Sequence, residues 1–274
     1  MKGQQTNAPA PRKGATRAAD IPQSVMEALA RGEIESATLA EALAVDQARL
    51  VRTVFPELSA AATAKVDTLT RQGILKRMTG MGALLLRELG PACVDRCRAH
   101  RSDTVRGWAC FAIGALEGLN LPARLEAVQP LVDDAHFGVR EWAWMGIRAH
   151  LVDDLDAAIE HLLPWTDSPS ERVRRFASEA LRPRGVWCAH IAALKQQPQR
   201  AMPILSALRD DPSIYVQDSV ANWLNDASKD QPEWARSVCR QWLAEAPSVA
   251  TRRICHRGLR SIAGNVSATH PEAF

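Results

Sequence analysis

From residue 20 onward, apolar side chains recur every three to four positions between polar ones, and alternating runs of β-branched residues are nearly absent. This spacing places the apolar side chains on one face of an α-helix. Alanine, leucine, arginine and glutamate, which favour helices, are abundant. The pattern predicts an all-α fold, whose first helices cover residues 21–31, 36–44, 50–58 and 60–70.

One helical layout repeats along the chain. A polar turn, a valine, a polar residue and an apolar helix follow one another in residues 102–116, 136–151, 170–183 and 213–226. The first three valines are 34 residues apart and the next gap is 43: Val105, Val139, Val173 and Val216. A weaker copy at 247–262 has Ala250 at this place. Two helices in a repeat of this length indicate an α-solenoid of HEAT-like repeats, with the valine-anchored helices along one concave face.

The turns that precede these helices carry Asp, Ser and Pro, at residues 133–134, 167–169 and 210–212. Asp and Ser cap helix N-termini, and Pro fits the first helical turn. Each of these turns is therefore expected to start a helix.

The chain is expected to divide into an arm, one domain and a tail. Residues 1–19 are basic and rich in Ala, Pro, Gly and Gln, without the apolar stretch of a secretion signal. We predict a disordered basic arm there, a single repeat domain over 20–264 and a tail over 265–274. Within the domain, residues 20–100 form a divergent helical part and 101–264 form the repeats with the site.

Composition limits the candidate functions. The net charge is only +3, so a nucleic-acid surface has to arise from local clustering. The longest apolar run, near residues 81–86, is too short to span a bilayer. The six cysteines form no paired CxxC motif and the seven histidines form no HxxxH pair. A cytoplasmic protein with reduced thiols and no metal is expected.

Positive charge concentrates in residues 171–187, which place five arginines around Glu179 and end on Trp187. Over residues 171–200, seven Lys or Arg oppose two Glu. Such a cluster suits a polyanion such as DNA, through non-specific and salt-sensitive contacts. A carboxylate there either has a specific task or forms an ion pair with Arg175 or Arg182.

Three carboxylates lie on valine-anchored helices, at different depths along them. Glu141, Glu179 and Asp226 lie 2, 6 and 10 residues after their valines. These offsets differ by about one helical turn, so the side chains are expected to point in similar directions from successive helices. A plain helix C-terminal residue is the alternative for Asp226.

Three motifs carry a resemblance. Residues 174–187 (RRFASEALRPRGVW) resemble a signature of the AlkC family of bacterial DNA alkylation repair glycosylases. Residues 219–232 (SVANWLNDASKDQP) resemble a second signature and residues 139–144 (VREWAW) a third, in the family's order. The resemblance covers roughly residues 20–262.

The resemblance implies HEAT-like repeats, shared with AlkD relatives, that form a C-shaped, positively charged groove. It implies hydrolysis of the N-glycosidic bond of alkylated, cationic bases such as 3-methyladenine in double-stranded DNA, as a step of base excision repair. No cofactor and no membrane are expected, and the protein is expected to act as a monomer.

The resemblance also implies a set of site residues. The catalytic carboxylates fall on Glu141, Glu179 and Asp226, the site tryptophan on Trp187 and a neighbouring arginine on Arg182. Further candidates for contact with DNA, from their place near the site, are Trp144, Arg148, Arg175, Arg184, Lys229 and Arg252. The remaining large aromatic residues are assigned mostly to packing: Trp108, Trp165, Trp223, Trp234 and Trp242.

A second hypothesis remains open. A non-catalytic HEAT-repeat module that binds DNA structures or a protein would show the same repeats. The two hypotheses differ in whether the three carboxylates converge.

Overall fold

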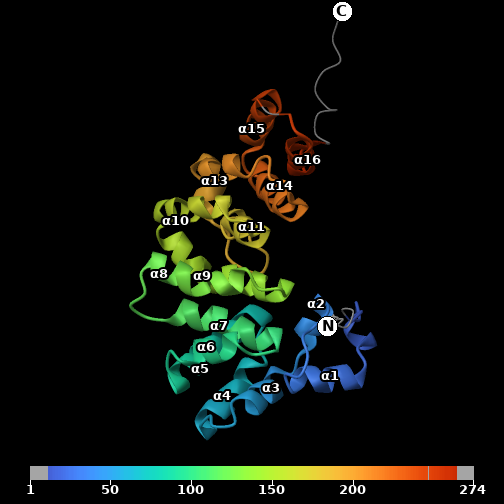
Figure 1. Ribbon diagram of the computed structural model, residues 1–274, viewed down its shortest axis with the longest axis vertical. Helices are drawn as coiled ribbons and strands as arrows, with labels where there is room; N and C mark the ends of the chain where they lie inside the picture. Colours follow the sequence, from blue (N-terminus) through green and yellow to red (C-terminus); the bar gives the residue numbers. More distant parts are fainter. Residues whose placement is uncertain (1–11, 246, 264–274) are drawn as a thin grey trace, which may run out of the picture. The chain divides into compact units, whose positions relative to one another are not determined.

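The computed structural model describes residues 12–245 and 247–263, in which every regular element is a helix (Figure 1). The all-α prediction is confirmed. Contacts divide the chain into two compact units, one ending at Ala112 and the other beginning at Ile113, where a single repeat domain was predicted. The predicted C-terminal tail and the first eleven residues of the predicted arm lie outside the described residues.

The first unit is built from short helices. They are the 3₁₀-helix η1 Ala18–Asp20, α1 Gln23–Ala30, α2 Leu39–Ala44, α3 Gln47–Val54, α4 Ala60–Leu69, α5 Ile74–Leu89, α6 Cys93–Arg98 and most of α7 Asp103–Ala115. The helix predicted at 50–58 is shifted toward the N-terminus. It starts early because the Asp46 side chain caps it, and it ends at Val54 because Pro56 disfavours helical backbone at the preceding residue.

Residues 12–19 correct the prediction of a disordered arm. The Arg12 guanidinium donates to both oxygens of the buried Glu41 carboxylate, at 2.8 and 2.5 Å. The same carboxylate accepts from the backbone N–H groups of Ala15 and Ala37, at 3.1 and 2.8 Å. One buried carboxylate on α2 thus holds this part of the arm in place.

The second unit is a succession of helix pairs (Figure 1). Its elements are α8 Leu121–Val132, α9 Phe137–Asp153, α10 Leu155–Leu162, η2 Leu163–Asp167, α11 Glu171–Glu179, α12 Ala192–Gln196, η3 Pro198–Ala201, α13 Met202–Ala207, α14 Ile214–Ser228, α15 Pro232–Glu245 and α16 Val249–Gly258. The valine-anchored helices are α9, α11 and α14, and their valines are buried. The predicted α-solenoid is confirmed.

Side chains cap the starts of these helices, as predicted, but serines and a histidine form the caps rather than the aspartates. Ser170, Ser213 and Ser248 cap α11, α14 and α16, and His136 caps α9. The aspartates of the same turns do not cap the helices: Asp211, for example, accepts from the Arg174 guanidinium and from the Ser213 N–H that precedes α14.

Packing of the second unit sets up the site. α11 lies against α14, and α14 lies against α16. Trp223 and Trp242 are buried in its core, as predicted, whereas Trp165 and Trp234 are half-buried and contact other aromatic rings. In the described residues, no helix has the length and hydropathy that crossing a membrane requires.

Candidate active site

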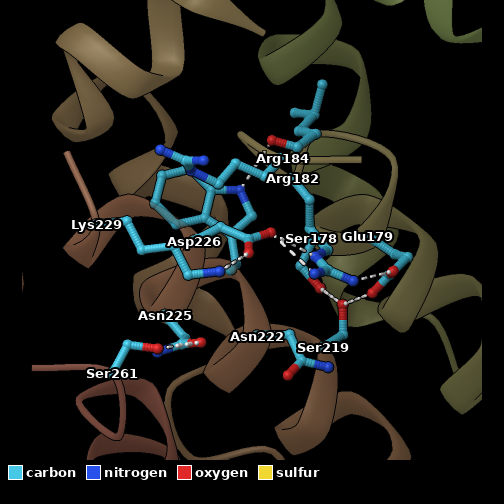
Figure 2. A network of polar contacts seen from close by, with 12 residues as sticks. Ser178, Glu179, Arg182, Arg184, Ser219, Asn222, Asn225, Asp226, Lys229 and Ser261 are labelled. Carbon is cyan, nitrogen blue, oxygen red and sulfur yellow. Dashed lines mark hydrogen bonds and ion pairs between the residues drawn. The ribbon is translucent and has the colours of Figure 1, made fainter. Parts of the chain in front are cut away.

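Two arginines of α11 and its following turn join the three predicted carboxylates into one chain of alternating charge. Arg175 Nη2 lies 2.7 Å from Glu141 Oε1 and 3.6 Å from Glu179 Oε2. Arg182 Nη1 donates to Glu179 Oε1 at 2.9 Å, and its Nε donates to Asp226 Oδ2 at 3.0 Å. Figure 2 shows Arg182 between Glu179 and Asp226. The offsets read from the sequence therefore do bring the three carboxylates together, through shared arginines.

The three carboxylates differ in their access to solvent. The Glu141 side chain is 33% exposed, whereas those of Glu179 and Asp226 are 5% and 6% exposed. Burial by itself raises the pKa of Glu179, but the positive charges of Arg175 and Arg182 outweigh it and lower the pKa below its ordinary value. Glu179 is therefore a buried carboxylate that stays ionised.

The arginines are held in the charged form as well. Burial lowers the pKa of Arg175 and of Arg182, but the facing carboxylates more than compensate and raise both pKa values. At the α14 end of this chain of ion pairs, the partly exposed Lys229 ammonium lies 3.5 Å from Asp226 Oδ1. Lys229, Arg182 and Arg175 thus oppose Asp226, Glu179 and Glu141 one to one.

Two serines complete the surroundings of Glu179 and were missed in the sequence. Ser219 Oγ donates to Glu179 Oε2 at 2.7 Å, and Ser178 Oγ lies 2.8 Å from Ser219 Oγ (Figure 2). A signal was present, since Ser219 lies seven residues before Asp226, on the same face of α14.

Aromatic residues surround Glu141, at one end of the chain of ion pairs. The Arg175 guanidinium lies over the Tyr215 ring, 4.5 Å from its centroid, and Tyr215 is a contact that the sequence did not indicate. Trp144 donates its indole N–H to Glu141 Oε2 at 2.9 Å. Because Trp144 is only 2% exposed, its predicted contact with DNA is wrong; it orients Glu141 from the core instead.

Trp187 lies in the turn that follows α11. Its side chain is 45% exposed and its backbone has φ +64°, in the left-handed region that residues with a side chain seldom occupy. The ring stacks on that of Trp142, with the centroids 6.4 Å apart. Exposure of a large indole in an unfavourable backbone conformation is typical of functional positions, and a role of Trp187 at the site stays a prediction.

Arg148 corrects another prediction. It is buried, and its guanidinium donates to the backbone carbonyls of Ala180, Arg182 and Ala189 at 2.6, 2.7 and 3.4 Å. Burial lowers the pKa of this arginine. Arg148 therefore holds the turn that carries Trp187. A contact with DNA had been predicted for it, and its burial contradicts that prediction.

The five arginines of residues 171–187 all have carboxylate partners. Besides Arg175 and Arg182, the pairs are Arg172 with Asp133, Arg174 with Asp211 and Arg184 with Asp230. The predicted excess of positive charge in this segment is thus largely neutralised by neighbouring repeats. Arg252, the last predicted contact, is exposed and donates to the Pro247 carbonyl, apart from the carboxylate chain.

Comparison with known proteins identifies related chains. No family model matches the sequence. The uncharacterized protein YhaZ of Bacillus subtilis is 41% identical over 122 residues, which are 44% of this chain and 33% of YhaZ. The aligned part is thus about a third of that relative.

Three solved structures share the arrangement of helices. The alkylpurine DNA glycosylase AlkC of Pseudomonas fluorescens, bound to DNA containing an abasic site analog, matches with a TM-score of 0.63 and 24% identity over 87% of this chain and 62% of its own. AlkD2 of Streptococcus mutans matches with a TM-score of 0.58 and 21% identity over 74% and 99% of the two chains. The chain has the AlkC/AlkD fold. A third structure of this fold, smu.31 of Streptococcus mutans UA159, has a TM-score of 0.56 and 22% identity, over 72% of this chain and 97% of its own.

The shared fold agrees with the fold that the resemblance of the three motifs implied. At these identities the likeness is one of fold, and the chain spans less than two thirds of the AlkC chain. The roles of Glu141, Glu179, Asp226 and Trp187 stay predictions.

Proposed function

We propose that the protein is a DNA glycosylase that hydrolyses the N-glycosidic bond of alkylated, cationic bases such as 3-methyladenine in double-stranded DNA. The observation that carries this proposal is the chain of three carboxylates and two guanidiniums across α9, α11 and α14. The fold shared with AlkC, a glycosylase solved on DNA, supports it. A C-shaped, positively charged groove around the site stays part of the proposal.

The proposed reaction needs negative charge more than it needs an acid. An alkylated purine already carries a positive charge, so it leaves without a strong general acid. The sugar gains positive charge as the bond breaks, and fixed carboxylates away from bulk water stabilise that charge. A water held by a carboxylate then attacks the anomeric carbon, as in inverting glycoside hydrolysis.

We assign a different task to each of the three carboxylates, from its exposure and its contacts. Glu141 is the most exposed, so it faces the cationic base or the sugar. Asp226 Oδ1 faces the flexible Lys229 ammonium at 3.5 Å, and movement of Lys229 to a phosphate frees this oxygen for a water. Glu179 has both oxygens engaged, by Arg182 and Ser219, and fixes Arg175 and Arg182 between the other two carboxylates.

The test is release of free bases from methylated duplex DNA, resolved by chromatography. Wild-type protein is expected to release 3-methyladenine, and Glu141→Gln and Asp226→Asn are each expected to slow release on the order of 10²–10³-fold. Asp211→Asn is the matched control, because Asp211 is an equally buried partner of Arg174 outside the carboxylate chain. Absence of any released base with wild-type protein, or full activity of both variants, contradicts the proposal.

The alternative, a non-catalytic module that binds DNA, is favoured by one observation. Both oxygens of Glu179 are engaged, by Arg182 and Ser219, in the manner of a structural ion pair. On that hypothesis wild-type protein binds DNA and releases no base, and Glu141→Gln leaves binding unchanged.

A further inference from the structure

The C-terminal helix carries a row of arginines that the sequence analysis did not assign as a group. Arg253 and Arg257 lie one turn apart on α16, and Arg260 follows just after its end. The spacing of four residues places Arg253 and Arg257 on one side of the helix, and Arg260 lies beside them, since its guanidinium donates to the Arg257 carbonyl. We call these three residues the α16 arginine row.

The row has fewer carboxylate partners than guanidiniums. Arg253 Nη2 donates to Asp218 Oδ1 at 2.7 Å, and Arg257 Nε lies 3.1 Å from the same oxygen. Arg260 Nη2 donates to the neutral Asn222 amide oxygen at 2.9 Å. Among the described residues, the three guanidiniums of the row therefore share one carboxylate in direct contact, that of Asp218.

This excess contrasts with the arginines of residues 171–187. Each of those has a carboxylate partner, and the chain from Lys229 to Glu141 is electrically balanced. Unbalanced charge attracts a polyanion more strongly than paired charge does. The α16 arginine row is therefore a better candidate for phosphate binding than the paired arginines of residues 171–187.

The row lies next to the candidate site. Asp218, Asn222 and Asp226 follow one another every four residues along α14, so they share one face of that helix. The first two contact the row and the third belongs to the carboxylate chain. Burial, followed by the neighbouring Arg257 charge, lowers the pKa of Arg260, as expected where cations are crowded.

We propose that the α16 arginine row binds successive phosphates of one DNA strand and so presents that strand to the carboxylate chain. This inference rests on the proposed function. The Arg253 and Arg257 side chains are 30% and 43% exposed, and each guanidinium has donors left for a phosphate. The seven residue steps from Arg253 to Arg260 span roughly 10 Å at a helical rise, which is about three axial steps of ~3.4 Å between phosphates of one strand.

The experiment measures binding of an undamaged fluorescent duplex at several salt concentrations. The row variant carries Arg253→Gln, Arg257→Gln and Arg260→Gln. Its control carries Arg172→Gln, Arg200→Gln and Arg209→Gln, which remove the same charge from arginines that each have their own carboxylate partner. Thermal unfolding by circular dichroism checks that both variants fold.

The row variant is expected to bind at least tenfold more weakly, with the slope of log K against log salt reduced by about 2–3, since each lost phosphate contact removes ~0.9. The control is expected to keep most of the wild-type slope. Equal effects of the two variants, or an unchanged slope in the row variant, overturn the inference.

Asp218→Asn provides a second test, in which the expected result is tighter binding and so cannot arise from a variant that fails to fold. It removes the one carboxylate shared by Arg253 and Arg257, so DNA binding is expected to tighten and its salt slope to grow. Weaker or unchanged binding contradicts the inference.

Base release separates this inference from the proposed function. If the protein is a glycosylase, the row variant is expected to show a raised KM and an unchanged kcat. If wild-type protein releases no base while the row variant still loses its salt slope, the glycosylase proposal fails and the phosphate-binding row stands.

Discussion

The buried guanidinium of Arg148 donates a 2.7 Å hydrogen bond to the backbone carbonyl of Arg182. It also donates to Ala180, just after the end of α11, where carbonyls lack a partner within the helix. The negative end of the α11 dipole offsets part of the buried charge. A side chain of α9 thus fixes the backbone from which Arg182 and Trp187 project.

Arg148→Met is expected to keep the bulk of the side chain and leave these carbonyls without donors. We expect a loss of about 2–4 kcal/mol in the free energy of unfolding, because buried carbonyls lose charged donors. The indole of Trp187 should also become more mobile, which shifts its fluorescence and opens residues 183–189 to limited proteolysis.

Arg124 provides the matched control for Arg148. It too is buried and donates to backbone carbonyls, those of Gly114 and Leu116 among them, at 3.2 and 2.8 Å. Arg124→Met should destabilise the protein to a similar extent without changing Trp187 emission. If both variants change the emission alike, Arg148 has no specific link to the turn.

Ser219→Ala is expected to remove one of the groups that keep Glu179 ionised. Folded-state stabilisation of a carboxylate with a lowered pKa is present above its unfolded pKa and is lost as the pH falls. Without the Ser219 hydrogen bond the pKa of Glu179 rises, so the loss begins at a higher pH. Urea unfolding between pH 4 and 8 measures this, with a cost at neutral pH of about 1.5–3 kcal/mol.

Ser178→Ala is the control for Ser219→Ala, because Ser178 contacts Ser219 and does not reach Glu179. Its effect should be smaller and largely independent of pH. Equal pH profiles for the two variants would show that Ser219 does not act on the carboxylate.

Glu41 is expected to give the first unit its own acid sensitivity. The hydrogen bonds of Arg12, opposed by burial and aided by the Ala37 and Ala15 N–H groups, lower the pKa of Glu41 from 4.5 to about 2. Its stabilisation is therefore complete above its ordinary pKa and disappears as the pH falls toward 2. Glu41→Gln should remove this dependence and release residues 12–19 to proteases at neutral pH. Glu33→Gln, which alters an exposed pair with Arg31, should leave stability nearly unchanged, because solvent screens such pairs.

Gly114→Ala is expected to separate two segments that touch through their backbones. A Cβ on Gly114 would lie 2.1 Å from the Gly146 carbonyl oxygen, so one helix must shift. Alanine favours a helix over glycine by roughly 1 kcal/mol, yet we expect a net loss of about 1–3 kcal/mol from overpacking. Gly73→Ala, where a Cβ meets nothing within 4 Å, should cost at most about 1 kcal/mol, from replacing the glycine N-cap of α5. Thermal unfolding of both variants checks the contrast.

The local pattern of apolar and polar residues predicted most of the helices. The apolar period, the valine positions and the serine caps are properties of short stretches, so they predicted the helices and repeats of the second unit. Pro56 was present in the sequence as well, and its effect on the preceding residue would have corrected the end of α3. The division at Ala112 and Ile113 depends on contacts between distant residues and was not predicted.

The candidate site was predicted in part. The offsets of Glu141, Glu179 and Asp226 aligned them correctly, because the helical period is regular over a repeat. The sequence by itself thus determined which helices carry acids and arginines, and on which faces. Only the tertiary structure decided which charges neutralise one another, that Arg148 is a buried support, and that the unbalanced arginines lie on α16. Ion pairing depends on distances of a few ångströms between side chains of packed helices, and repeat spacing does not contain that information.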